Sequence, residues 1–307
     1  MIQRVLVIKL GALGDFILAL GPFAAIRKAH PDAEVTLLTT SPFVDLARMS
    51  GYFDDVWVDA RPPLAAFSRW RALRKKLREG RFDRVYDLQT SDRSDWYFRL
   101  LGPGRRPEWS GRVRGSSLRH ANPRRDHMHT ADRQADQLKV AGISNVPLPD
   151  VSWVRADVAR FGLSQRYVLI VPGGAAHRPA KRWPWRRYGH LGQCCVETGI
   201  EPVVIGALPE APLAAEIVAV CPAARNLCGE TSIADIAALA RGAAGAVGND
   251  TGPMHVIAAA GCPSLVLYSA DSDPDLTKPV GPDVAVLCRP NLADLKVDEV
   301  AAALRLR

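Results

Sequence analysis

Cysteine is scarce in this 307-residue sequence, and its spacing carries no metal-binding or disulfide pattern. No cysteine occurs in the first 190 residues, and no two are spaced as C-x-x-C. The six are Cys194, Cys195, Cys221, Cys228, Cys262 and Cys288. This distribution argues against a zinc site and a disulfide framework, and it predicts reduced, mostly buried thiols.

Long hydrophobic runs are also missing. Apolar stretches such as Val5–Ile8 and Leu265–Tyr268 fall far short of the ~20 residues that a spanning helix needs. Met1–Arg4 leads directly into a strand-like segment, without the pattern of a secretory signal. We therefore expect a cytoplasmic protein, and 48% hydrophobic residues over this length suffice for two domains with separate cores.

Residues 1–150 lack the acidic residues that would balance their basic ones. They contain 25 Lys/Arg and 17 Asp/Glu, whereas residues 151–307 contain 15 of each, so the net charge of +8 belongs to the first half. Six cations lie on a predicted helix near residues 65–79. A basic half predicts an anionic partner, either phosphorylated lipid at a membrane surface or nucleic acid.

Strand-like and helix-like segments alternate along the whole chain, and the alternation restarts after Asp150. Such alternation predicts parallel sheets with crossover helices. The clearest predicted strands are Arg4–Leu10, Glu34–Thr39, Arg84–Asp87, Tyr167–Val171, Glu201–Ile205, Gly245–Val247 and Ser264–Tyr268. We expect two Rossmann-like domains, 1–150 and 151–307, with ligands at the carboxyl ends of strands in the cleft between them.

A glycine turn follows the first strand and delivers a carboxylate at a helix start. Gly11–Asp15 reads GALGD, which is either a functional loop or an ordinary turn with an acidic cap. A dinucleotide site would instead need G-x-G-x-x-G and an acidic residue after the second strand, which ends in Thr39-Thr40. NAD binding is thereby disfavoured.

Two loops in the second half have the composition of a phosphate site. The first runs from Val171 to Pro184 and contains Lys181 close to Trp183, a point charge suited to a diphosphate. The second, Gly248–His255, joins a strand to a helix that starts near Pro253, where free N–H groups favour an anion. Capping alone is the competing explanation for Asp250 and Thr251.

Two possible metal motifs are better explained without a metal. Asp271–Asp275 reads DSDPD but lacks the glycine and glutamate of a calcium loop, so we expect a solvated turn. His120, His127 and His129 lie in an arginine-rich loop without cysteine, and we interpret them as surface groups.

Together these segments resemble the heptosyltransferases of glycosyltransferase family 9. The likeness is carried by an ordered set: Val7–Leu10, Leu13–Asp15, Pro22, His30–Glu34, Tyr86–Gln89, Arg93-Ser94, Pro172-Gly173, Lys181–Pro184, Gly206, Glu210, Asp250–Pro253 and His255. The resemblance implies a GT-B fold, with an acceptor site in the first domain and a nucleotide-sugar site in the second. It also implies an inverting enzyme that needs neither metal nor cofactor, with ADP-heptose as donor and the lipopolysaccharide core as acceptor.

The resemblance also assigns roles. Asp15 would be the general base, and Lys181 would stabilise the departing diphosphate together with the helix start at Thr251-Gly252. Glu210 would contact the donor ribose. The full donor set is Gly14, Gly173, Lys181, Glu210, Asp250, Thr251, Gly252 and His255. From charge and loop position, the candidates for acceptor phosphates are Arg93, Arg112, Arg114 and Arg119.

Other functions remain open at this stage. The enzyme could use another nucleotide sugar or an acceptor other than lipopolysaccharide. From a different class, the seven arginines of residues 105–125 could belong to a nucleic-acid-binding protein, although no known nucleic-acid motif is present. The helix near residues 68–79 could touch anionic headgroups and give peripheral contact with the inner membrane, or it could be a solvated basic face.

Overall fold

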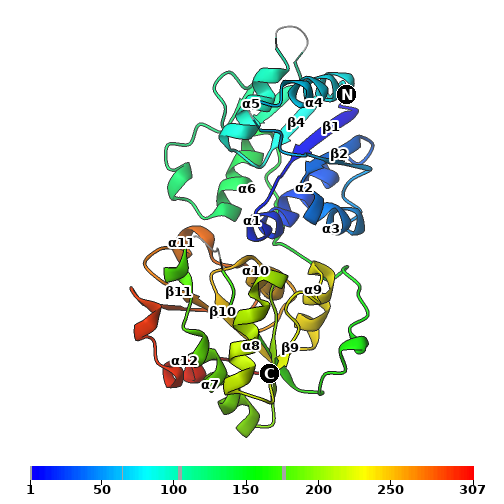
Figure 1. Cartoon of the computed structure of the whole chain (residues 1–307). Coiled ribbons are helices and arrows are strands. Elements are labelled where there is room, and N and C mark those ends of the chain that lie inside the picture. The colour runs from blue at the N-terminus through cyan, green and yellow to red at the C-terminus, as the bar shows by residue number, and fades with distance from the viewer. Residues whose placement is uncertain (1, 64, 103–105, 175–177) are drawn as a thin grey trace. The chain divides into compact units, whose positions relative to one another are not determined.

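The computed structural model describes residues 2–63, 65–102, 106–174 and 178–307. The chain divides into two compact units, Met1–Leu148 and Pro149–Arg307, coloured from blue to green and from green to red in Figure 1. Each unit is a parallel sheet with helices packed against it. The expected α/β organisation is therefore confirmed for each half.

The first unit contains a six-stranded parallel sheet in the order β3-β2-β1-β4-β5-β6. Its strands are β1 Arg4–Ile8, β2 Glu34–Thr39, β3 Asp55–Val58, β4 Arg84–Asp87, β5 Glu108–Gly111 and β6 Leu118–Arg119. Its α-helices are α1 Leu13–Leu18, α2 Leu20–Ala29, α3 Val44–Met49, α4 Phe67–Glu79, α5 Asp92–Leu100 and α6 Thr130–Val140.

The first sheet is buried on both faces, because side chains alternate along each strand. Leu6 and Ile8 of β1 point toward α4 and α5 and pack with Leu77 and Tyr97. Val5 and Val7, which are fully buried, face the other way, where α2 and α6 contact each other. The strands consequently read as near-continuous apolar runs.

The second unit repeats the design with the order β12-β11-β10-β7-β8-β9. Its strands are β7 Tyr167–Val171, β8 Glu201–Val204, β9 Arg225–Asn226, β10 Gly245–Asn249, β11 Ser264–Tyr268 and β12 Val284–Cys288. Its α-helices are α7 Trp185–Glu197, α8 Ala211–Val220, α9 Ile233–Gly242, α10 Gly252–Ala259, α11 Pro274–Thr277 and α12 Val297–Ala303.

Both sheets have the same topology when the strands are counted within each unit. In each, the first strand lies between the second and the fourth, so the strand order reverses between the first and fourth strands. That place is β1/β4 in the first unit and β7/β10 in the second. Open parallel sheets bind ligands at the carboxyl ends of the strands at this switch point.

The sequence-based prediction was wrong in two regions. Residues 102–126 were expected to be irregular, but they contain β5 and β6, and Trp109 of β5 is only 1% exposed. The second half also contains β9, β12 and α12, which were not predicted. β6 and β9 have only two residues each, too few for an alternation of side chains to be read.

The thiols match their prediction: all six are free, four are buried, and Cys288 is exposed. Across the described parts of the chain, none of the helices combines the length and the apolar character needed to cross a bilayer.

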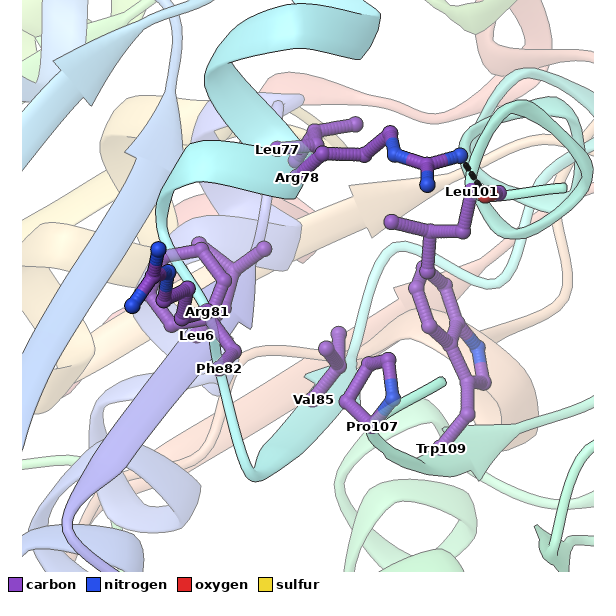
Figure 2. Close-up of a pocket in the computed structure, with 9 residues that line it drawn as sticks. All are labelled: Leu6, Leu77, Arg78, Arg81, Phe82, Val85, Leu101, Pro107 and Trp109. Atoms are coloured by element: carbon purple, nitrogen blue, oxygen red, sulfur yellow. Dashed lines mark hydrogen bonds between the residues drawn. The ribbon is translucent and has the colours of Figure 1, made fainter. Parts of the chain in front are cut away.

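A cavity of about 290 Å³ lies in the first unit between α4, the end of α5 and the sheet (Figure 2). Its lining residues are Leu6, Leu77, Arg78, Arg81, Phe82, Val85, Leu101, Pro107 and Trp109. Arg81 and Phe82 precede β4 and Pro107 precedes β5, so the cavity opens near the amino ends of these strands. It is therefore separate from the switch point of that sheet.

Candidate functional site

The turn after β1 carries Asp15 and is fixed by three side chains. Gln89 accepts a hydrogen bond from the Leu10 N–H at 2.8 Å, while Thr40 and Arg61 donate to the Leu10 carbonyl at 3.0 and 2.7 Å. Asp15 lies half-buried in the first turn of α1, where the helix dipole favours an anion. The structure thus holds the predicted base in a braced turn.

Gly11 makes this turn possible. Its φ of +121° is a backbone conformation that favours glycine, and a Cβ there would lie 3.0 Å from the Phe43 ring. Gly14, the neighbouring glycine predicted to contact the donor, is buried within α1.

A buried lysine lies beneath the same turn. Lys9 is 3% exposed, and its Nζ donates to the Leu88 carbonyl at 3.3 Å, which ties the end of β1 to the end of β4. Burial lowers the pKa of the Lys9 ammonium, and the charges of Asp15 and Asp87 oppose that shift. The candidate base therefore shares its surroundings with a desolvated cation.

Asp87, the last residue of β4, is completely buried. Its Oδ1 accepts from the N–H groups of Gln89 and Thr90 at 3.1 and 2.9 Å. Burial is the main cause that raises the pKa of Asp87 to about 6, and these hydrogen bonds limit the rise. Its charge is consequently sensitive to pH just below neutrality.

In the second unit, the two predicted loops meet. Lys181 Nζ and Asp250 Oδ2 form an ion pair at 2.8 Å, and their side chains are only 12% and 11% exposed. Lys181 comes from the loop after β7 and Asp250 from the turn after β10. The switch point of the second sheet therefore holds a paired, poorly hydrated cation.

The turn after β10 leads into α10, whose first residues are Gly252 and Pro253. Thr251 is the N-cap residue, and its side chain makes no capping hydrogen bond. The first N–H groups of any helix lack an intrahelical acceptor, so this helix start can receive an anion. His255, one turn further along, is buried.

Glu210 braces the loop after β7 from the other side. One carboxylate oxygen accepts from the Gly174 N–H at 3.0 Å and the other from the Ala207 N–H at 2.8 Å. The carboxylate occupies the space above Gly173, where a Cβ would lie 1.7 Å from Oε1. Gly173 and Glu210, predicted from the sequence as donor residues, are thus in direct contact.

A sequence model of glycosyltransferase family 9 (heptosyltransferase) matches residues 70–303. The chain belongs to glycosyltransferase family 9. It is 27% identical to lipopolysaccharide heptosyltransferase 2 of Escherichia coli over 93% of this chain and 88% of that protein. This family 9 transferase is also 29% identical to lipooligosaccharide heptosyltransferase 2 of Haemophilus influenzae, over 41% of this chain and 37% of that one.

Solved structures of similar fold include two heptosyltransferases. Escherichia coli ADP-heptose lipopolysaccharide heptosyltransferase II has a TM-score of 0.79 at 23% identity, covering 98% of this chain and 97% of that one. An Escherichia coli heptosyltransferase with ADP has a TM-score of 0.76 at 20% identity, covering 98% of both chains. These likenesses confirm the GT-B fold for the family 9 chain.

The arginines proposed for the acceptor differ in their surroundings. Arg112 forms ion pairs with Asp92 and with Asp95, the latter at 3.1 Å, so its charge is already compensated. Arg93 is half-buried and donates to the Pro62 carbonyl at 3.3 Å. Arg114 and Arg119 are exposed, which makes them the more accessible of the four candidate arginines.

One histidine prediction was wrong. His120 is 1% exposed rather than a surface group, and its Nε2 lies 2.8 Å from Asp136 Oδ2. It is buried because β6 ends immediately before it. His127 is exposed, and the half-buried His129 caps α6 by accepting from the Ala131 N–H.

The DSDPD segment starts a helix. The Asp273 side chain accepts from the Asp275 N–H at 2.9 Å and caps α11. Within the ranges that the structure describes, no three His, Cys, Asp or Glu side chains are grouped so as to hold a metal ion.

Sequence reasoning missed two buried polar residues of this family 9 chain. Lys9 and Asn249 both lie at the carboxyl ends of strands, and both hydrogen-bond across the switch point of their sheet. Lys9 was noted only as part of a motif. Their strand-end positions beside apolar runs were the available signal, since a buried polar group needs a partner.

Proposed function

We propose that this transferase moves a heptose from ADP-heptose to a lipopolysaccharide core acceptor, with inversion at the anomeric carbon. The observation that carries the proposal is the largely buried Lys181–Asp250 ion pair, with side chains 12% and 11% exposed, beside the start of α10. A cation and a helix N-terminus converge there, as a diphosphate requires. The names of the Escherichia coli relatives, which specify ADP-heptose and lipopolysaccharide, supply the identity of the substrates.

Lys181 would stabilise the charge that develops on the leaving diphosphate. Asp250 compensates the charge of the lysine and holds its side chain in place. The N–H groups at the start of α10 add fixed partial positive charge, which needs no reorganisation during the reaction. Glu210, beside Gly173, is the proposed partner of the donor ribose, and Asp250 and His255 complete the proposed donor set.

Asp15 is the proposed general base. The acceptor hydroxyl oxygen bonds to the anomeric carbon while its proton passes to the Asp15 carboxylate. The bond between the anomeric carbon and the phosphate oxygen breaks, and ADP leaves with that electron pair. The single displacement inverts the anomeric configuration.

We further propose that no metal ion takes part. Lys181 and the α10 start provide the positive charge that a divalent cation would otherwise supply. Transfer should therefore continue at an unchanged rate after dialysis against EDTA. Loss of activity that returns with Mg²⁺ or Mn²⁺ would contradict this part of the proposal.

An anionic glycolipid is the proposed acceptor, reached by peripheral contact with the inner membrane from the cytoplasmic side. On α4 only Leu77 is buried, six cations stand against one acidic residue, and Phe67 at its start is 78% exposed. Basic residues near a membrane gain about 1 kcal/mol each from anionic lipid. The proposed acceptor-phosphate contacts are Arg93, Arg112, Arg114 and Arg119.

Vesicle binding tests the membrane contact. The chain should sediment with phosphatidylglycerol vesicles at low salt and not with phosphatidylcholine vesicles. Arg69→Glu combined with Arg71→Glu should abolish the binding, whereas Asp132→Asn, an exposed position on α6, should leave it unchanged. If the double variant binds these vesicles as well as the wild type does, α4 is a solvated face that does not contact the membrane.

Nucleotide preference tests the donor. The purified chain is heated with ADP, UDP, GDP or NAD at equal concentration, since a ligand at ~100 times its dissociation constant adds about 2.7 kcal/mol of stability. Selective stabilisation by ADP is the expected result, followed by transfer from ADP-heptose. Preference for UDP or GDP would indicate another nucleotide sugar, and stabilisation by NAD alone would overturn the proposal.

A further inference from the structure

Asn249 is the last residue of β10 and is completely buried. Its side-chain amide uses its full donor capacity and accepts two further hydrogen bonds. Nδ2 donates to the carbonyls of Pro172 and Gly173 at 2.8 and 3.1 Å, and Oδ1 accepts from the Trp183 N–H and the Tyr188 hydroxyl, both at 2.9 Å.

These bonds cross the switch point of the second sheet. β10 pairs with β7 in parallel, with Gly248 opposite Val171, so Asn249 stands beside the point where the chain leaves β7. The amide holds both ends of the following loop: its start at Pro172-Gly173 and its end at Trp183. Lys181 lies two residues before that end, and Asp250 directly follows Asn249 in sequence.

We propose that Asn249 is the positioning residue of the nucleoside-diphosphate site, which sets where Lys181 meets the diphosphate. This inference rests on the proposed function, which places the donor diphosphate at Lys181. Asn249 itself touches no substrate in this scheme. It acts by fixing the backbone on both sides of Lys181, while Asp250 orients the lysine side chain.

Only a neutral amide fits these four partners. Two carbonyl oxygens require two N–H donors, and a backbone N–H and a hydroxyl require an acceptor. An ionised aspartate has no proton to donate, so its second oxygen would face two carbonyl oxygens. A protonated aspartate would restore one donor. Asn249→Asp therefore turns the positioning role into a pH-dependent property.

The experiment measures the dissociation constant of ADP by calorimetry from pH 5.5 to 8.5 for the wild type, Asn249→Asp and Tyr188→Phe. At pH 8.5 the Asp variant should bind ADP about tenfold or more weakly than the wild type, because two buried hydrogen bonds are lost. That ratio should shrink as the pH falls and the new carboxyl group takes up its proton. The ratio to wild type removes the pH dependence of ADP itself.

Tyr188→Phe is the matched control. It removes one hydrogen bond from the same amide but leaves the three bonds to the loop, so ADP binding should change less than about threefold. Melting curves are recorded for every variant. If Asn249→Asp fails to fold, Asn249→Ser replaces it, since a hydroxyl can serve only one of the two carbonyls, and weaker binding than wild type is again expected.

Wild-type affinity in the Asn249 variant at pH 8.5 would overturn the inference, as would an equal loss in Tyr188→Phe. The failure of the proposed function looks different. If the wild type binds UDP or GDP instead of ADP, the donor assignment fails, and the same comparison is made with that nucleotide. If the wild type binds no nucleoside diphosphate, both proposals fall.

Discussion

The two units share one strand order but differ in the charged group that we propose acts at each switch point. In the first unit, the half-buried Asp15 carboxylate sits in a turn above the buried Lys9. In the second, the Lys181 ammonium, proposed to contact the diphosphate, is held by Asp250. Under the proposed function, the same parallel framework presents a proton acceptor in one unit and an anion-binding group in the other.

The way the loops are tied also differs. In the first unit, three side chains bond to one residue of the β1 turn: Gln89 accepts from the Leu10 N–H, and Thr40 and Arg61 donate to the Leu10 carbonyl. In the second, the Asn249 amide makes four bonds and holds both ends of the β7 loop. The turn that carries Asp15 is thus anchored at one residue, Leu10, by three side chains, whereas the β7 loop is anchored at both ends by one side chain.

The largest effect should come from Asp15→Asn. Loss of a general base reduces kcat by about 10²–10⁴-fold, because the acceptor hydroxyl can no longer transfer its proton as it attacks. The dissociation constant of ADP, measured by calorimetry, should not change. Turnover at the wild-type rate would refute the assignment of the base. Weakened ADP binding would contradict the proposal that the donor binds to the second unit alone.

Lys181→Ala should act on the other unit. Removing a preorganised cation costs about 10²–10³-fold in kcat, and it leaves Asp250 uncompensated, so ADP binding should weaken as well. The uncompensated Asp250 carboxylate would repel the diphosphate, and the double variant Lys181→Ala/Asp250→Asn removes that negative charge. It should recover part of the ADP affinity without recovering kcat. If the two variants bind ADP equally, the ion pair is not part of the donor site.

Asp87 should make the stability of the first unit depend on pH. Because its folded pKa is raised to about 6, the folded chain binds more protons than the unfolded chain between about pH 4 and pH 6. The free energy of unfolding contributed by this group therefore falls as the pH rises through that window. Asp87→Asn keeps an Oδ1 acceptor and removes the titration.

Denaturant titrations at pH 4 and pH 7 test this expectation. The free energy of unfolding of Asp87→Asn, relative to that of the wild type, should rise by about 3 kcal/mol from pH 4 to pH 7, because the pKa of Asp87 is shifted by roughly two units. A difference that stays constant with pH would show that Asp87 titrates normally.

The smallest effect should come from Gly173→Ala. The new methyl group would lie 1.7 Å from Glu210 Oε1, so Glu210 must move and release the Gly174 N–H. Overpacking of this kind costs about 1–3 kcal/mol, and ADP affinity should fall with it. Gly174→Ala is the control, since its Cβ would lie 3.6 Å from Arg182, an ordinary contact. Equal effects at both positions would contradict the role of Glu210.

The sequence predicted the fold well because its strong signals were long. Buried parallel strands such as Tyr167–Val171 read as continuous apolar runs, and the glycine turns mark where they end. Short edge strands gave no such signal. Leu118–Arg119 acquires strand geometry only because the neighbouring β5 offers backbone partners.

For the site, the sequence identified loops rather than contacts. Lys181 and Asp250 were both proposed, but residues 69 apart cannot be known to form an ion pair from spacing. Asn249 was included only as part of the Gly248–His255 segment and was given no role of its own. Only its burial and its four partners, which depend on the folded sheet, reveal what it does.

The distribution of thiols makes the chain suitable for site-selective labelling. The first unit contains no cysteine, and in the second Cys288 is the exposed one. Burial raises the pKa of Cys195 to about 11 and that of Cys262 to about 12, so both react slowly near neutral pH. A fluorophore on Cys288 would therefore report on the second unit alone.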